Sequence, residues 1–396
     1  MVDKNEPSHS ESCRILIRGV NWLGDAVMST PALQRLRERF PNAHIALLIQ
    51  EKLAGLWEHQ PSINTVIPFS PGDSIFSISR RLRQEKCDTA LVLPNSPRSA
   101  LEVWLAGIPR RVGHSRLWRN CFLTQVVPGR PGHITMKKRP AHEVKELIAA
   151  CGKITPSQPI PTNAHQIHDF LHLAAALGSN PLPLKPFLHV TDAEMAGTAK
   201  RFQLAPDKAS RTYPLFGLNA GAEYGPAKRW PRERFVAAAV EVQKRTKCRW
   251  LIFGGTADID LAEEIASSLE TLHGKLIADW GIPPPLNLTG RTTLRELCSL
   301  LKLCDAFLTN DTGPMHVAAA VGTPVVVPFG STSPELTGPG LPGDRGQQLL
   351  KSTAPCSPCF RRTCPIDFRC MTGITVESVV EAVMQAASGS KKAAVD

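Results

Sequence analysis

Short runs of β-branched and leucine residues alternate with segments of helical periodicity. This pattern runs through the first half of the chain and begins again in the second half. Such alternation is typical of parallel α/β units, and 396 residues are enough for two domains. The predicted strands are 14–18, 45–49, 65–69 and 89–93, then 215–219, 249–253, 306–309 and 324–328. The predicted helices are 31–40, 74–86, 98–106, 168–177 and 192–202, then 232–245, 259–272, 294–303, 314–320 and 376–387.

The predicted fold is therefore α/β, with two Rossmann-like, doubly wound domains that face a central cleft. We expect domains at 13–190 and 213–375, a linker region at 191–212, a C-terminal helix at 376–387, and flexible tails at 1–12 and 388–396. Ligands of doubly wound sheets bind at the carboxyl ends of the strands. The ligand is expected between the two domains.

The net charge and the hydropathy of the chain limit which partners and which location are expected. The net charge is +11, which attracts anions such as phosphates, nucleic acids or an acidic membrane. Only 6% of residues are aromatic, and none interleave with basic residues as a nucleic-acid stacking platform requires, so no nucleic-acid partner is expected. The apolar stretch 317–329 is too short to span a bilayer, and 1–12 does not resemble a signal peptide. A cytoplasmic protein is expected.

Several common motifs are missing. The sequence has no G-x-G-x-x-G after its first strand and no G-x-x-x-x-G-K-[ST], so a dinucleotide-binding oxidoreductase and a P-loop enzyme lose their main support. H-E-x-x-H and G-x-S-x-G are also absent.

Asp25 follows the first predicted strand in the turn Trp22-Leu-Gly-Asp25. An acid in this place commonly caps a helix or interacts favourably with the helix dipole. It could instead act as a general base if its carboxylate faces an acceptor hydroxyl. Spacing alone favours the capping role.

Two later loops carry residues suited to a diphosphate. Lys228 and Arg229 end a Gly/Pro-rich turn after the strand at 215–219, where they could neutralise phosphate or be ordinary solvated charge. Asp311, Thr312 and Gly313 precede a helix with Pro314 in its first turn. A helix start offers N–H groups to an anion, although a simple capped core helix is the alternative.

Two further loops contain small residues that let backbone approach a ligand closely, at 253–255, which includes Gly254, and at 329–334. Asp258 and Asp260 could form a D-x-D metal pair, but acids are favoured in a first helical turn in any case.

Four cysteines lie within fifteen residues, at Cys356, Cys359, Cys364 and Cys370. The first pair resembles a zinc ribbon, whereas the spacing of the others fits no standard template. The segment is a candidate structural metal site, a redox or disulfide site, or a group of structural thiols.

In their residues and in their order along the chain, these motifs resemble those of the ADP-heptose-dependent lipopolysaccharide heptosyltransferases of glycosyltransferase family 9. The resemblance rests on 22–25, 93–96, 106–109, 221–231 and 310–320, and spans Arg14 to about Val383. It implies the GT-B arrangement, with the acceptor bound by the first domain and the ADP-sugar by the second. The acid in the first turn then becomes the catalytic base, Asp25.

The resemblance also implies donor-binding residues and an inverting displacement. The donor set is Lys228, Arg229, Glu223, Asp311, Thr312, Gly313, His316 and Gly254. The acceptor hydroxyl attacks the anomeric carbon while a carboxylate takes its proton. Lys228, Arg229 and the helix start near Gly313 stabilise the departing diphosphate, so no cofactor is required.

The implied acceptor is the anionic heptosyl-Kdo-lipid A inner core, which a peripheral enzyme would reach at the cytoplasmic face of the inner membrane. Residues 98–139 carry nine Lys or Arg and one Glu, which suits such an acceptor or forms a solvated face. The acceptor-binding candidates are Arg98, Arg110, Arg111, Lys137 and Lys138. A monomer is expected.

Two segments depart from the family pattern: the four-cysteine segment and a Pro-rich stretch at 156–172. We expect neither to touch the assigned motifs. Alternative functions are addition of the first or third heptose, and a non-catalytic sugar-nucleotide-binding protein with a cysteine-bound metal.

Overall fold

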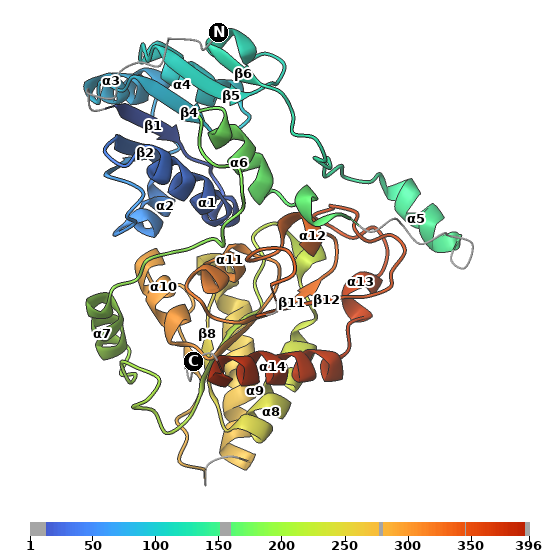
Figure 1. The fold of residues 1–396 in the computed structure, drawn as a ribbon. Coiled ribbons are helices and arrows are strands. Elements are labelled where there is room, and N and C mark those ends of the chain that lie inside the picture. The colour runs from blue at the N-terminus through green and yellow to red at the C-terminus, as the bar shows by residue number, and fades with distance from the viewer. Residues whose placement is uncertain (1–12, 151–159, 277–279, 345, 393–396) are drawn as a thin grey trace. The chain divides into compact units, whose positions relative to one another are not determined.

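The computed structural model describes residues 13–150, 160–276, 280–344 and 346–392. By their contacts these residues form two units, each with a parallel six-stranded sheet flanked by helices (Figure 1). Of the described residues, the first unit comprises those up to Asn21, those of Pro31–Arg130 and those of Asp169–Leu182. The second comprises those of Trp22–Thr30, those of Pro131–His168 and those from Pro183 onward. The predicted tail 1–12 and the end of the tail, 393–396, lie outside the described residues.

The first sheet has the strand order β3-β2-β1-β4-β5-β6, the order of a doubly wound fold. Its strands are β1 (Arg14–Arg18), β2 (His44–Gln50), β3 (Thr65–Phe69), β4 (Thr89–Val92), β5 (Arg110–His114) and β6 (Gln125–Val127). The helices of this part are α1 (Leu23–Arg39), α2 (Glu51–Ala54), α3 (Ile75–Gln84), α4 (Pro97–Leu105) and α6 (Ile167–Ala175). Leu16, Ala46 and Ala90 from neighbouring strands are fully buried in its core.

The second sheet repeats this topology in the order β12-β11-β10-β7-β8-β9. Its strands are β7 (Leu215–Asn219), β8 (Arg249–Ile252), β9 (Leu286–Asn287), β10 (Ala306–Thr309), β11 (Val325–Phe329) and β12 (Gln347–Lys351). The remaining helices are α5 (Ala141–Ala149), α7 (Asp192–Arg201), α8 (Arg232–Thr246), α9 (Ile259–Leu276), α10 (Leu294–Leu303), α11 (Gly313–Ala320), α12 (Pro334–Thr337), α13 (Arg369–Thr372) and α14 (Val376–Lys392).

The two sheets confirm the predicted α/β fold with doubly wound topology. In the second sheet the strand order reverses between β7 and β10, which pair in parallel. The loops that follow these two strands leave the same edge of the sheet, so residues about 90 positions apart in the chain come together there.

Helix α1 begins earlier than its sequence predicts. Pro31 indicates a helix start at position 31, yet the helix begins at Leu23 and contains Pro31 in its interior. Proline removes the N–H that would bond the carbonyl of Val27, and the Thr30 hydroxyl donates to that carbonyl at 2.8 Å instead. The earlier start places Asp25 in the first helical turn.

Helix α14 extends past the predicted end at 387 to Lys392, and β5, β6, β9, β12 and α5 were not predicted. No helix among the described residues has the length and apolar character needed to cross a bilayer.

Candidate functional site

The loops after β7, β10 and β11 meet around one ion pair. Lys228 Nζ lies 2.6 Å from the Oδ2 atom of Asp311, and the side chains are 13% and 5% exposed. The Thr332 hydroxyl donates to the same carboxylate oxygen at 2.5 Å. An ammonium group and a carboxylate are therefore held together at the carboxyl edge of the second sheet. Thr332 was not predicted from sequence.

Asn310 fixes the position of the Lys228 loop. Its Oδ1 atom accepts from the Trp230 N–H at 2.9 Å, and its Nδ2 atom donates to the Ala220 carbonyl at 2.7 Å. Asn310 is fully buried, so both bonds form away from water. The bonds join the loop after β10 to both ends of the loop that carries Lys228.

The first turns of α1 and α11 pack directly on each other, within the second unit. A Cβ atom on Gly313 would lie 2.8 Å from Leu23, and one on Gly24 would lie 2.8 Å from the ring of His316. A side chain at either position would collide with the facing helix, so the close packing of the two helices requires both glycines. The first N–H groups of a helix have no partner within that helix, and here two such helix starts are adjacent, which favours an anion.

Asp25 lies at this junction and is half-buried. Its removal from water raises the pKa of the carboxyl group to about 6, whereas a hydrogen bond from Gln166 and the charge of Lys228 act in the opposite direction. The Gln166 amide donates to Asp25 Oδ1 at 3.4 Å. Asp25 is thus mostly ionised at pH 7, yet basic enough to accept a proton.

The His316 ring packs against Gly24, the residue before Asp25. Burial lowers the pKa of its imidazole to about 4, with Asp311 acting against this shift and His165 and Lys228 adding to it. The ring is therefore uncharged at pH 7. The uncharged ring packs against Gly24 and adds no positive charge to the site.

Three buried hydroxyl groups near these loops have no hydrogen-bond partner among the residues that the structure describes: Thr312 Oγ1, Ser331 Oγ and Thr289 Oγ1. Thr312 caps α11, and Ser331 follows β11. Thr289 lies against Gly254, where a Cβ atom would be 2.9 Å from its methyl group. Buried polar groups are normally paired, so these hydroxyls mark places where a polar ligand would complete the bonding.

The other predicted donor residues lie on the same loops. Arg229 is half-exposed and its guanidinium lies 3.6 Å from the Asp258 carboxylate. Glu223 is exposed on the loop after β7. Asp258 bonds the Gly255 N–H at 3.2 Å, and Asp260 starts α9 at the surface. Asp258 thus caps a helix and pairs with an arginine.

The predicted acceptor residues are divided between the two units. Arg98 starts α4 and donates to Glu102 at 3.1 Å and to the Asp73 carbonyl at 2.7 Å. Arg110 and Arg111 begin β5, at the amino edge of the first sheet, where Arg111 bonds the Phe122 carbonyl at 2.7 Å. Lys137 and Lys138 are exposed in the second unit, before α5. Their role in acceptor binding stays a prediction.

The expectation that the two departing segments avoid the motifs is wrong. Gln166, which contacts Asp25, belongs to the Pro-rich stretch. Within the four-cysteine segment, the Arg362 carbonyl accepts from the Ala227 N–H at 3.0 Å, and the Phe360 carbonyl accepts from the Tyr224 hydroxyl at 2.8 Å. Sequence could not reveal either contact, because each spans more than 130 residues of chain.

The four-cysteine segment also forms hydrogen bonds with the loop after β11. The N–H groups of Cys359 and Phe360 donate to the Ser331 carbonyl at 3.1 and 2.6 Å. The Tyr224 ring lies between two cations, 4.8 Å from Lys228 Nζ and 5.2 Å from the Arg362 guanidinium. This segment therefore positions the loops that hold Lys228 and Ser331.

The cysteine side chains themselves are largely buried. Burial raises the pKa of the Cys370 thiol to about 12 and that of Cys356 above its ordinary value. In this part of the described chain, no three of the four sulfur atoms all lie within 4.8 Å of one another. Metal binding by Cys356, Cys359, Cys364 and Cys370 stays a prediction.

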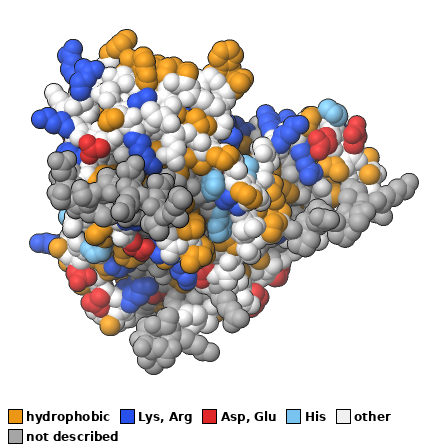
Figure 2. All heavy atoms as spheres, turned by 45° about the horizontal axis from the view of Figure 1, so that its top comes forward, with side chains coloured by type: hydrophobic (Ala, Val, Ile, Leu, Met, Phe, Trp, Pro, Cys, Tyr) orange, Lys and Arg blue, Asp and Glu red, His pale blue; other side chains and the backbone are white. Residues whose placement is uncertain are grey.

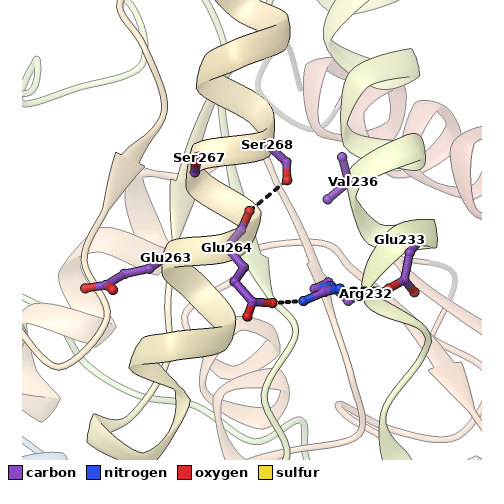
Figure 3. A pocket seen from close by; sticks show the side chains of 7 residues that line it. All are labelled: Arg232, Glu233, Val236, Glu263, Glu264, Ser267 and Ser268. Atoms are coloured by element: carbon purple, nitrogen blue, oxygen red, sulfur yellow. Dashed lines mark hydrogen bonds and ion pairs between the residues drawn. The ribbon is translucent and has the colours of Figure 1, made fainter.

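A separate open groove lies between α8 and α9, with a volume of about 640 Å³ (Figure 3). Arg232 extends across it and pairs with Glu233 and Glu264. The groove contains none of the predicted site residues, and its cation is already neutralised by two carboxylates. It is distinct from the Asp25 and Lys228 cluster.

Comparison with known proteins identifies the family. A family model described as glycosyltransferase family 9 (heptosyltransferase) matches residues 136–368, more than half of the chain. The chain belongs to glycosyltransferase family 9. It is therefore a glycosyltransferase of a heptosyltransferase family, as the motifs indicated.

Two curated relatives and one solved structure of this family are similar over most of their length. Lipopolysaccharide heptosyltransferase 2 of Escherichia coli (strain K12) is 31% identical over 82% of this chain and 85% of the relative. Lipooligosaccharide heptosyltransferase 2 of Haemophilus influenzae is also 31% identical, with the same coverage. The structure described as E. coli ADP-heptose lps heptosyltransferase II superposes with a TM-score of 0.71 at 27% identity, covering 96% of this chain and 99% of that one.

Proposed function

We propose that this family 9 enzyme transfers a heptose from ADP-heptose to the heptosyl-Kdo-lipid A inner core of lipopolysaccharide, with inversion at the anomeric carbon. Asp25 is the general base, and the loops around Lys228 and Asp311 bind the donor. The observation that carries the proposal is the placement of an Asp25 carboxyl group with a pKa near 6 in the same cluster as Lys228 and two helix starts.

The reaction is a single displacement. The acceptor hydroxyl oxygen forms a bond to the anomeric carbon while the bond from that carbon to the diphosphate oxygen breaks. The hydroxyl proton passes to Asp25, whose raised pKa makes it a better proton acceptor than an ordinary aspartate. The electron pair of the broken bond leaves with ADP.

Charge on the departing diphosphate needs compensation. Lys228 supplies a cation, and the start of α11 supplies N–H groups and the positive end of the helix dipole. Thr312 and Ser331 add buried hydroxyls that have no partner in the described part of the chain. On donor binding the diphosphate would share Lys228 with Asp311. This arrangement supplies positive charge from the chain itself.

The acceptor is anionic and carried by a lipid, so the enzyme would act as a peripheral protein at the cytoplasmic face of the inner membrane. The relatives named as heptosyltransferase 2 support addition to a core that already bears one heptose.

A donor and acceptor panel tests this function. We expect ADP release and product formation with ADP-heptose and a mono-heptosylated Kdo-lipid A acceptor. UDP- and GDP-sugars should give no product. Transfer to the heptose-free acceptor instead would assign the first-heptose step, and binding of ADP-heptose without any transfer would support the non-catalytic alternative.

Gln166 offers a test of the base through pH. Its amide stabilises the ionised form of Asp25, so Gln166→Leu should raise the Asp25 pKa above about 6. A hydrogen bond to a charged group is worth on the order of one pKa unit, so the acidic limb of kcat/KM should move to higher pH by about that much. Gln34→Leu, three turns along α1, is the matched control. An unmoved limb in Gln166→Leu would remove Gln166 from the mechanism.

A further inference from the structure

Leu117 and Trp118 form the exposed tip of the loop that follows β5 in the first unit. Their side chains are 81% and 80% exposed, the highest values among the large hydrophobic residues described. Phe76, at the start of α3, is 75% exposed. Exposed apolar residues are common singly, but adjacent leucine and tryptophan at one loop tip present an apolar surface that water does not favour.

The loop is not loosely attached. The Ser115 N–H donates to the Val127 carbonyl at 2.8 Å, and the Asn120 side chain bonds both the Arg116 N–H, at 3.0 Å, and the Ser115 hydroxyl, at 3.2 Å. Arg119, directly after the tip, is fully buried and donates to the Pro94 carbonyl at 2.8 Å. The tip is therefore held from both sides.

The backbone at the tip is also unusual. Trp118 has a φ of 66°, a conformation that non-glycine residues rarely adopt. The conformation costs free energy, and an indole that is 80% exposed gains little from packing against the described residues of this chain. A partner outside the chain would account for both features.

Charge around the tip indicates what this partner is. Arg116 is exposed beside Leu117. Phe76 lies in the first turn of α3, and Arg98 in the first turn of α4 donates to the Asp73 carbonyl, two residues before α3. Residues 74–130 contain ten Lys or Arg and three Asp or Glu. The upper part of Figure 2 shows hydrophobic side chains beside Lys and Arg side chains with few acids. Aromatic residues with neighbouring cations suit the headgroup level of an anionic bilayer.

We infer that the Leu117–Trp118 tip inserts into the anionic phospholipid surface that carries the acceptor, with Arg116 at the headgroups. The inference rests on the proposed function for its lipid-borne acceptor. The tip then docks the first unit on the membrane, and chemistry takes place at the Asp25 cluster.

Co-flotation of the full-length protein with vesicles tests the tip. We expect binding to vesicles of equal parts phosphatidylcholine and phosphatidylglycerol, and much weaker binding to phosphatidylcholine alone. The double variant Leu117→Ser/Trp118→Ser should bind the anionic vesicles on the order of tenfold more weakly, since two apolar side chains no longer leave water. Arg116→Glu should weaken binding to anionic vesicles only. Leu182→Ser, an exposed leucine elsewhere in this unit, is the matched control.

Activity separates this inference from the proposed function. The double variant should lose turnover of acceptor embedded in vesicles while retaining turnover of a deacylated, water-soluble acceptor. Equal vesicle binding by wild type and double variant would overturn the inference, as would a wild-type dimer that the double variant converts to a monomer. Absence of transfer by the wild type to either acceptor would overturn the proposed function. Vesicle binding by the wild type and the double variant would then be the test of membrane insertion by the tip.

Discussion

Asp25→Asn is expected to lower kcat by about 10²- to 10⁴-fold while ADP affinity stays nearly unchanged. Asparagine has the same shape and can still accept the Gln166 hydrogen bond, but it cannot take a proton from the acceptor hydroxyl. Steady-state kinetics with ADP-heptose, together with calorimetric titration of ADP, measure the two quantities separately. The residual rate should also lose its acidic limb, because the group with a pKa of about 6 is gone.

The competing role for Asp25 is favourable interaction with the α1 dipole, which is worth about 0.3–1 kcal/mol. In that case Asp25→Asn would lower the free energy of unfolding slightly and leave turnover intact. Asp260→Asn removes an exposed acid from the first turn of α9 and serves as the matched control. A fully active Asp25→Asn enzyme would exclude Asp25 as the base.

Lys228→Met should lower kcat by about 10²- to 10³-fold and weaken ADP binding. In the proposed reaction the change removes the cation that would face the departing diphosphate, and losing one such stabilising group typically has this cost. It also leaves the buried Asp311 carboxylate without its cation, which is destabilising by itself. Thermal unfolding must therefore accompany the kinetics.

A second variant separates the two effects. Lys228→Met/Asp311→Asn carries no unpaired buried charge, so its unfolding temperature should recover toward that of wild type, while activity stays low. Lys244→Met changes an exposed lysine on α8 and is the control. If the double variant recovers turnover together with stability, Lys228 is a structural residue and the leaving group is stabilised elsewhere.

The central strands of both sheets were predictable because each is a short, buried run made mostly of apolar residues. β7 and β10 match their predicted bounds, and α10 does so because Thr293 and Glu296 form a capping box at its start. The missed strands lack this signature. β6, β9 and β12 are short or half-exposed, and β5 begins with two arginines.

The candidate site was predictable where it rests on loops after strands, as with Asp25, Lys228 and Asp311. The resemblance to a known family was needed to change Asp25 from a predicted cap into a predicted base. The contact of Gln166 with Asp25 could not be found, since it spans 141 residues of chain. Thr332 lies in the loop 329–334, which was predicted only as a place of close backbone approach, so its bond to Asp311 was missed. Pro31 misled the prediction of α1, because Thr30 bonds the carbonyl that the proline leaves free.

The boundary between the two units falls within helix α1 and within helix α6, and this limits which segments can be exchanged between this enzyme and its relatives. By their contacts, Trp22–Thr30 and Pro131–His168 belong to the second unit, although they lie in the first half of the chain. A chimaera that exchanges the N-terminal half at the linker would combine Asp25 and Gln166 of one protein with the Lys228 loop of another. An exchange of Pro31–Arg130 and Asp169–Leu182 alone should instead keep Asp25 and Gln166 together with the Lys228 loop of the same protein.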